Sequence, residues 1–264
     1  MRPNTVKQKW SEGGVTIGGW LGLPSSYSAE IMANQGFDWL CIDTQHGGID
    51  YTGAFSMLQA LSMTPTVPFV RVPWNEPSII MKYLDAGAYG IIVPMISTKA
   101  DAEAAVKACR YPPDGLRSYG PNRVSYYAGD NYAVEANREI ALFVLIETAE
   151  ALENLDEICS VPGIDACYIG PSDLNQALGL HPRADVFDER HWSTCQRIRR
   201  VCEEHGVVPG IHTWGAEYAS RYIRDGFKMI MLTTDTAGII AGAQSELAGI
   251  KEALAEVEMK PLGA

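Results

Sequence analysis

The chain has 264 residues, of which 47% are hydrophobic, and its formal net charge at pH 7 is −11. This length and apolar content suffice for a substantial core, and we expect a single domain over residues 1–264. The acidic balance argues against nucleic acid and anionic membranes as partners, because both favour a basic surface. No apolar run approaches the roughly 20 residues of a membrane span, and the N-terminus lacks the apolar segment of a secretory signal. We therefore expect a cytoplasmic protein with no membrane contact.

Eight short apolar runs follow one another along the chain, at residues 15–22, 39–45, 67–72, 90–96, 141–148, 165–171, 207–214 and 228–235. Most are continuously apolar, which is typical of strands buried on both faces. Stretches of helical period lie between them, for example at 26–36, 99–110, 147–160 and 194–206. Eight strands alternating with helices predict an α/β protein with a single (β/α)₈ TIM barrel. A doubly wound open sheet is the alternative, which the even spacing and the lack of an early GxGxxG disfavour.

Helix ends and one long connection can also be predicted. Ser28, Thr98 and Asp101 are expected near helix starts, and Gly36 and Gly206 just after helix ends. The longest interruption, residues 111–138, is rich in Pro, Gly, Tyr and Arg. Loops of this length in compact domains are usually lids or binding loops, so we expect one of the two here.

The chain contains six cysteines, namely Cys41, Cys109, Cys159, Cys167, Cys195 and Cys202. No two of them form a CxxC pair. This spacing predicts reduced thiols, as in cytosolic proteins, and gives no indication of a structural zinc site.

The active site of a (β/α)₈ barrel lies at the carboxyl ends of its strands. Polar and aromatic residues therefore matter where they follow an apolar run: Trp20, Asp43, Gln45, His46, Arg71, Glu147, Gly170, Pro171, Ser172, Asp173, His212 and Thr213. One histidine, one arginine and several carboxylates are expected to converge at this mouth. Trp20 is expected to line the substrate pocket.

Glu147 and Asp173 follow adjacent predicted strands. Two neighbouring carboxylates repel unless a cation lies between them. Mg²⁺ and Mn²⁺ accept one or two protein oxygens and take their other ligands from water and substrate. The sequence thus favours a divalent metal site. As alternatives, Glu147 is a first-turn acid of the next helix and Asp173 is an N-cap.

Arg71 ends a run that should be buried, so it must be paired. Its planar fork suits a substrate carboxylate or a developing enolate oxygen, and a structural ion pair with Asp43 or Glu147 is the alternative. His46 lies three residues after Asp43, a spacing that lets the carboxylate hold one ring nitrogen while the other acts as a base. A loop histidine with local hydrogen bonds is the alternative. No lysine lies at a carboxyl strand end, which argues against a Schiff-base aldolase.

Five stretches resemble the HpcH/HpaI aldolase family of metal-dependent pyruvate aldolases: GGWLGLPSSYSAEIMANQGFDWLCIDTQHG, PFVRVPWNEPSIIMKYLDAGAYGIIVPMI, RYPPDGLRSYGP, VLIETAEALENLDEI and YIGPSDLNQALG. The resemblance runs from about residue 10 to about residue 255. It implies a (β/α)₈ barrel, usually a homohexamer built as a trimer of dimers, in which a barrel helix packs between partners.

The resemblance also implies roles for individual residues. Glu147 and Asp173 would bind the divalent metal, which would be Mg²⁺, Mn²⁺ or Co²⁺. Arg71 would contact the pyruvate moiety, and His46, tuned by Asp43, would be the acid/base. The backbone of Gly170, Pro171 and Ser172 would shape the pocket.

The function that the resemblance implies is reversible cleavage of a 4-hydroxy-2-oxo acid into an aldehyde and pyruvate, or a close 2-oxo acid such as hydroxypyruvate. A related lyase acting on an acyl-CoA or a 2-oxo diacid, and a catalytically silent barrel, are the alternatives. The chain departs from the family at Gln45, where many members have Glu, and at Leu145, where the heptanedioate aldolases tend to have Gln. His212 and Thr213 replace an apolar end of the seventh strand. They are expected to bind a hydroxylated or acidic aldehyde, unless they form a rim pair that touches only water.

Overall fold

The computed structural model describes residues 1–183 and 187–258. Its centre is a closed barrel of eight parallel strands in chain order, in which every strand pairs with its sequence neighbours and β8 pairs with β1. The strands are β1 Thr16–Leu21, β2 Trp39–Asp43, β3 Val67–Arg71, β4 Gly90–Val93, β5 Ala141–Ile146, β6 Ala166–Ile169, β7 Val208–His212 and β8 Met229–Thr234. Each lies within one of the eight apolar runs, so the predicted barrel is confirmed and the open sheet is wrong.

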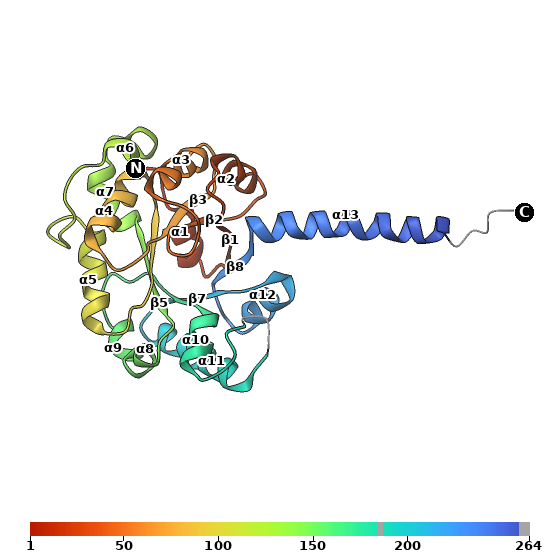
Figure 1. The fold of residues 1–264 in the computed structure, drawn as a ribbon. Helices are drawn as coiled ribbons and strands as arrows, with labels where there is room; N and C mark the ends of the chain where they lie inside the picture. Colours follow the sequence, from red (N-terminus) through yellow and green to blue (C-terminus); the bar gives the residue numbers. More distant parts are fainter. Residues whose placement is uncertain (184–186, 259–264) are drawn as a thin grey trace, which may run out of the picture.

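Helices surround the barrel (Figure 1). They are α1 Thr5–Ser11, α2 Ser26–Ala33, α3 Tyr51–Leu61, α4 Pro77–Ala86, α5 Lys99–Cys109, α6 Asn122–Ala128, α7 Tyr132–Glu139, α8 Ala149–Glu153, α9 Leu155–Cys159, α10 Pro171–Ala177, α11 Glu189–Glu204, α12 Gly215–Arg224 and α13 Asp235–Glu258. The four predicted helical stretches all contain helix, although the stretch 147–160 is divided into α8 and α9.

The predicted helix ends are mostly confirmed. Thr98 is the N-cap of α5 and forms a capping box with Asp101, an arrangement that satisfies two backbone N–H groups of the first turn. Gly206 follows the C-cap of α11 with φ 69°, as expected for a left-handed stop. The N-cap of α2 is Ser25, which accepts a hydrogen bond from the backbone N–H of Ser28. Ser28 therefore lies in the first turn of α2, near the helix start as expected.

Aromatic rings fill the amino-terminal half of the barrel. The rings of Trp39 and Phe69 are 5.5 Å apart, and those of Phe69 and Phe143 are 4.8 Å apart. A Cβ atom at Gly90 would lie 2.4 Å from Phe69 and 2.6 Å from Phe143, and one at Gly18 would lie 2.1 Å from Trp39. Glycine at these positions makes room for the rings, and the packed half leaves only the carboxyl end for a binding site.

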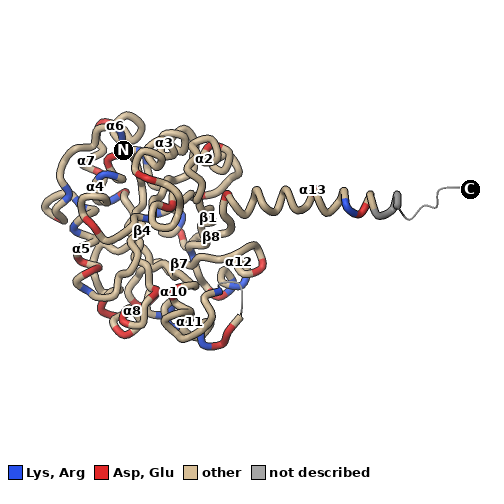
Figure 2. The backbone as a smooth tube through the Cα atoms, viewed as in Figure 1, with Lys and Arg blue, Asp and Glu red and all other residues tan. Residues whose placement is uncertain are grey.

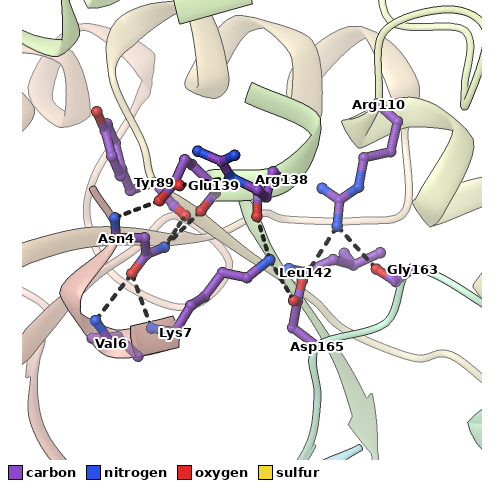
Figure 3. A network of polar contacts seen from close by, with 10 residues as sticks. All are labelled: Asn4, Val6, Lys7, Tyr89, Arg110, Arg138, Glu139, Leu142, Gly163 and Asp165. Atoms are coloured by element: carbon purple, nitrogen blue, oxygen red, sulfur yellow. Dashed lines mark hydrogen bonds and ion pairs between the residues drawn. The ribbon is translucent and has the colours of Figure 1, made fainter. Parts of the chain in front are cut away.

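Helix α1 closes the amino end of the barrel through a polar network (Figure 3). Asn4, the N-cap of α1, donates its side-chain amide to the carbonyls of Tyr89 (3.2 Å) and Glu139 (2.9 Å). Lys7 Nζ lies 2.7 Å from Asp165 Oδ1, next to the start of β6. These contacts tie the first turn of the chain to the connections before β4, β5 and β6.

The segment 111–138 is not a lid over the barrel mouth. It contains α6 and most of α7, and the Tyr127 hydroxyl donates to the carbonyl of Gly87 (2.7 Å), just before β4. Arg117 pairs with Asp85 at the end of α4 (2.7 Å). Because the segment follows a helix and precedes a strand, it lies at the amino end of the barrel. Of the two expected kinds of loop, a lid is excluded for this topological reason.

Helix α13 extends away from the barrel (Figure 1). Asp235 at its start is buried, but every described side chain from Gly238 to Leu254 is exposed. Figure 2 shows that basic and acidic residues are scattered over the barrel, whereas the first part of α13 carries few charges. Within residues 1–183 and 187–258, no helix has the length and apolar character needed to cross a membrane. Whether α13 and the barrel act as one domain over 1–264 stays a prediction.

Candidate active site

The structure brings together Trp20, Asp43, Arg71, Glu147 and His212 at the carboxyl end of the barrel. Four are the last or next-to-last residues of β1, β2, β3 and β7, and Glu147 follows β5. The negative charges of Asp43 and Glu147 both raise the pKa of Arg71, which shows that the three groups lie close together. The predicted convergence at the mouth is thus observed for these side chains.

Asp43 and Arg71 form a buried, two-pronged ion pair. The strand register places them opposite each other on β2 and β3. Arg71 Nε donates to Asp43 Oδ1 (3.0 Å), and Nη2 donates to Oδ2 (2.7 Å). Burial opposes ionisation of the carboxyl, but the hydrogen bonds and charge of Arg71, with help from Trp20, hold the pKa of Asp43 below its usual value. Burial also disfavours the charged Arg71 guanidinium, but the hydrogen bonds and charge of Asp43 outweigh this effect and raise the pKa of Arg71.

The Asp43 carboxylate holds the backbone of the following turn and not the His46 ring. Its Oδ1 accepts from the backbone N–H groups of Gln45 (3.1 Å) and His46 (3.2 Å). The predicted contact between Asp43 and a ring nitrogen of His46 is therefore replaced by a backbone contact. The His46 side chain is exposed at the mouth.

Glu147 is a buried carboxylate in a cradle shaped for it. Its side chain is 4% exposed, and Oε1 accepts from the backbone N–H of Met95 (2.8 Å). Met95 reaches this position with φ 57°, a left-handed conformation that is uncommon outside glycine. A Cβ atom at Gly170 would lie 2.6 Å from Glu147 Oε2, so any larger residue there would displace the carboxylate from this position. Two neighbouring loops are thus shaped around one carboxylate.

The ionisation of Glu147 is strongly perturbed. Burial raises its pKa to about 7, the hydrogen bond from Met95 opposes this shift, and the charge of Asp173 adds to it. Arg71 offsets only part of the effect. A cation beside Glu147 would favour its charged form.

Asp173 lies in the first turn of α10 with an exposed side chain. The N-cap of α10 is Gly170, so the alternative in which Asp173 is the N-cap is wrong. Glu147 precedes Thr148, the N-cap of α8, so it is not a first-turn acid either. In this turn Pro171 is buried and Ser172 is partly exposed, beside the carboxylate pair. The two carboxylates could hold a divalent metal ion, since both are hard oxygen ligands on adjacent strand ends.

An aromatic wall covers one side of the Arg71 guanidinium. The Trp20 ring centroid lies 5.0 Å from Arg71 Cζ and is stacked on Tyr168 at 6.0 Å. His212 contacts the edge of Trp20 at 5.0 Å, and its Nδ1 lies 3.3 Å from the Tyr168 hydroxyl. Burial and the charge of Arg71 lower the pKa of His212 to about 3. This histidine is therefore a neutral hydrogen-bonding group at physiological pH.

Thr213 does not face the mouth. Its side chain is buried, and its hydroxyl donates to the carbonyl of Met231 (2.5 Å). The hydroxyl thus links the end of β7 to β8. We expect Thr213 to position His212 and not to contact an aldehyde.

Sequence reasoning missed two contributors to the site. Tyr168 lies inside an apolar run, so nothing marked its ring and hydroxyl as part of the wall. Met95 acts through its backbone N–H, which no side-chain pattern can reveal. The only available signal was position, since Met95 lies near the carboxyl end of the fourth run, two residues after β4.

Comparisons with known proteins agree with this geometry. The sequence model described as HpcH/HpaI aldolase/citrate lyase matches residues 16–241. A hydroxypyruvate/pyruvate aldolase of Rhizorhabdus wittichii is 40% identical over 245 residues, covering 93% of this chain and 98% of the relative. A 4-hydroxy-2-oxo-heptane-1,7-dioate aldolase of Klebsiella pneumoniae is 38% identical, covering 92% of each chain. The crystal structure of a HpcH/HpaI aldolase/citrate lyase family protein from Burkholderia cenocepacia superposes with a TM-score of 0.87 at 31% identity, covering 94% of this chain and 99% of the other.

Replacing Glu147 by Gln should change how stability depends on pH in EDTA. The usual Glu pKa is 4.5 and the folded value is about 7, so the folded wild type binds the extra proton between these values. Stability of the wild type should therefore fall as pH rises from 4.5 to 7, by about 3 kcal/mol at most. Glu147→Gln keeps an acceptor for Met95 and has no proton to lose. Urea unfolding should show that, between pH 4.5 and pH 8, the free energy of unfolding of the variant rises relative to that of the wild type by about this amount. If the two free energies change with pH in parallel, Glu147 does not have the raised pKa.

Proposed function

Because the chain belongs to the HpcH/HpaI aldolase/citrate lyase family, we propose that it is a divalent-metal-dependent aldolase. It would reversibly cleave a 4-hydroxy-2-oxo acid into an aldehyde and pyruvate or a close 2-oxo acid such as hydroxypyruvate. The observation that carries the proposal is the buried Glu147 carboxylate, which lies near both Asp173 and the paired Arg71 at the barrel mouth. Its two curated relatives described above carry aldolase names, which supports the same class of reaction.

The residues at the mouth fit a divalent cation. Two carboxylates from neighbouring strand ends provide hard oxygen ligands, and the cradle of Met95 and Gly170 fixes one of them. Burial raises the pKa of Glu147 when no cation is bound, and a positive ion beside it would lower that pKa again by favouring the charged carboxylate. We propose Glu147 and Asp173 as the ligands, with Mg²⁺, Mn²⁺ or Co²⁺ as the ion. When bound, the ion would act as a Lewis acid toward the 2-oxo acid.

Arg71 would bind the substrate carboxylate or the developing enolate oxygen. Its Nε and Nη2 are held by Asp43, and no acceptor within the described residues is bonded to Nη1. The pair fixes the guanidinium plane before substrate arrives, so little reorganisation is needed when negative charge develops. Trp20 covers the guanidinium face and keeps water from it.

His46 would be the acid/base group. In the cleavage direction it would take the proton of the C4 hydroxyl, the C3–C4 bond would break, and the resulting enolate would be protonated at C3. In the synthetic direction it would remove a C3 proton and later return one to the new alkoxide. The contact between Asp43 and the His46 backbone orients the turn that carries the ring. His212, which is neutral and partly exposed beside Trp20, would offer a hydrogen bond to the aldehyde portion.

We also propose that the protein is a homo-oligomer, a hexamer by family resemblance, in which α13 packs on another copy. Ile240, Leu247, Ile250 and Leu254 recur at helical spacing on α13 and are all at least 55% exposed. An apolar stripe of this kind usually faces a packing partner. The six free cysteines, all buried, support the predicted reducing cytoplasmic location.

The first test is exchange of the pyruvate methyl protons with D₂O, followed by NMR. We expect exchange with Mg²⁺ or Mn²⁺ and its loss with EDTA, because enolate formation needs the metal-supported site. The assay needs no knowledge of the aldehyde. If no exchange occurs with Mg²⁺, Mn²⁺ or Co²⁺, with pyruvate or hydroxypyruvate and with an added aldehyde, the aldolase proposal fails and acyl-CoA substrates become the next candidates.

Replacing Arg71 by Lys should lower the exchange rate by about 100-fold or more, the usual cost of one positioned charge donor. A lysine cannot both hold the Asp43 carboxylate and present a planar fork to substrate. The matched control is Arg138→Lys, since Arg138 is 74% exposed and far from the mouth. Near-normal exchange in Arg71→Lys would remove Arg71 from the mechanism.

Introducing charge into the apolar stripe of α13 should disrupt the oligomer. We expect six chains for the wild type in sedimentation, and a smaller assembly for Leu247→Glu combined with Ile250→Glu. Ser245→Glu, on the opposite face of the same helix, is the control and should keep the wild-type size. A monomeric wild type, or a double variant of unchanged size, would contradict the proposed role of α13.

A further inference from the structure

Three cysteines from three different elements converge outside the barrel. Cys159 ends α9, Cys167 lies on β6, and Cys202 lies in α11. Their sulfur atoms all lie within 4.8 Å of one another, and Cys159 Sγ and Cys167 Sγ are 3.5 Å apart. All three are buried and none forms a disulfide. The cluster joins two helices to one strand.

This cluster is separate from the carboxylate site. Tyr168, the next residue on β6, points into the barrel, where it stacks on Trp20. Since successive side chains of a strand point to opposite faces, Cys167 points outward, toward α9 and α11. The barrel wall therefore stands between the thiols and the mouth.

We propose that Cys159, Cys167 and Cys202 bind one thiophilic metal ion that accepts three sulfur ligands, with monovalent copper as the representative ion. Sulfur ligands select soft ions over the hard Mg²⁺ and Mn²⁺ that carboxylates prefer. The distances among the sulfur atoms are short enough for one ion to contact all three. Zinc in structural sites takes four protein ligands, and no His, Asp or Glu of the described residues joins these three. A three-coordinate soft ion fits the donor set better.

Binding replaces protons and involves no change of oxidation state. Up to three S–H protons are released to solvent as three copper–sulfur bonds form, because the thiolate is the ligand. On the Cys159 side of the cluster, His205 Nε2 lies 2.9 Å from Asp156 Oδ1. Asp156 is exposed and lies on α9 with Cys159, so an ion would enter from this side of the cluster.

The test is anaerobic titration of the reduced full-length protein, free of other metals, with Cu(I) delivered from a coloured chelator. We expect one Cu(I) per chain, and X-ray absorption of the copper should show three sulfur neighbours. Cys159→Ser and Cys202→Ala should each weaken binding by more than about 100-fold, beyond the 10- to 100-fold that loss of an outer-shell partner costs. Circular dichroism of each variant establishes that it has folded, and two variants at different elements guard against one failing to fold.

Cys195→Ser is the matched control. Cys195 lies on α11 with Cys202 and is equally buried, but its sulfur faces His191 Nε2 (3.3 Å). It should bind Cu(I) like the wild type, and excess Mg²⁺ should not displace the ion. Absence of Cu(I) binding by the wild type, unchanged affinity in folded Cys159→Ser and Cys202→Ala, or equal loss in Cys195→Ser would each overturn the site. None of these results depends on aldolase activity.

Discussion

The burial of Glu147 at the end of β5 is the constraint on which the mouth of the barrel depends. A carboxylate removed from water needs hydrogen-bond donors or a cation, and the structure supplies one donor, the N–H of Met95. That donor is reached only because Met95 adopts a left-handed backbone conformation. On the other side, Gly170 leaves the space that any side chain would fill. The conformation of the loops after β4 and β6 therefore fits the buried Glu147 side chain after β5.

Strand order explains why the remaining groups meet. The parallel register places Asp43 on β2 opposite Arg71 on β3, so the two side chains form an ion pair across neighbouring strands. Such a pair stabilises the folded state only when its geometry is good, because desolvation costs each ion several kcal/mol. Here both carboxylate oxygens and two guanidinium nitrogens are used. The same carboxylate also bonds to the backbone of the turn that carries His46, so one side chain orients both the Arg71 guanidinium and this turn.

Much of this arrangement could be predicted from the sequence, since continuous apolar runs define the strands and barrel topology brings their carboxyl ends together. What could not be predicted depends on atoms that patterns do not encode. The spacing of Asp43 and His46 permits a ring contact or a backbone contact, and only the turn geometry decides between them. Thr213 reads as a polar residue at a strand end, but its hydroxyl bonds to the neighbouring strand. The segment 111–138 has the length of a lid, but its place between helix α5 and strand β5 puts it at the amino end of the barrel.

The thiol cluster is a further contact that the sequence pattern does not reveal. Their spacing in the chain gave no metal motif, because the three that meet are separated by 8 and 35 residues along the chain and come from different elements. Strand β6 then carries two kinds of chemistry on its two faces. Its inner face supplies Tyr168 to the aromatic wall, and its outer face supplies Cys167 to the thiol cluster. Hard oxygen and soft sulfur donors thus lie on opposite sides of the barrel wall, and this difference in ligand softness would keep the two proposed ions from competing for one site. A single barrel can hold both because the alternation of side chains along a strand separates them by construction.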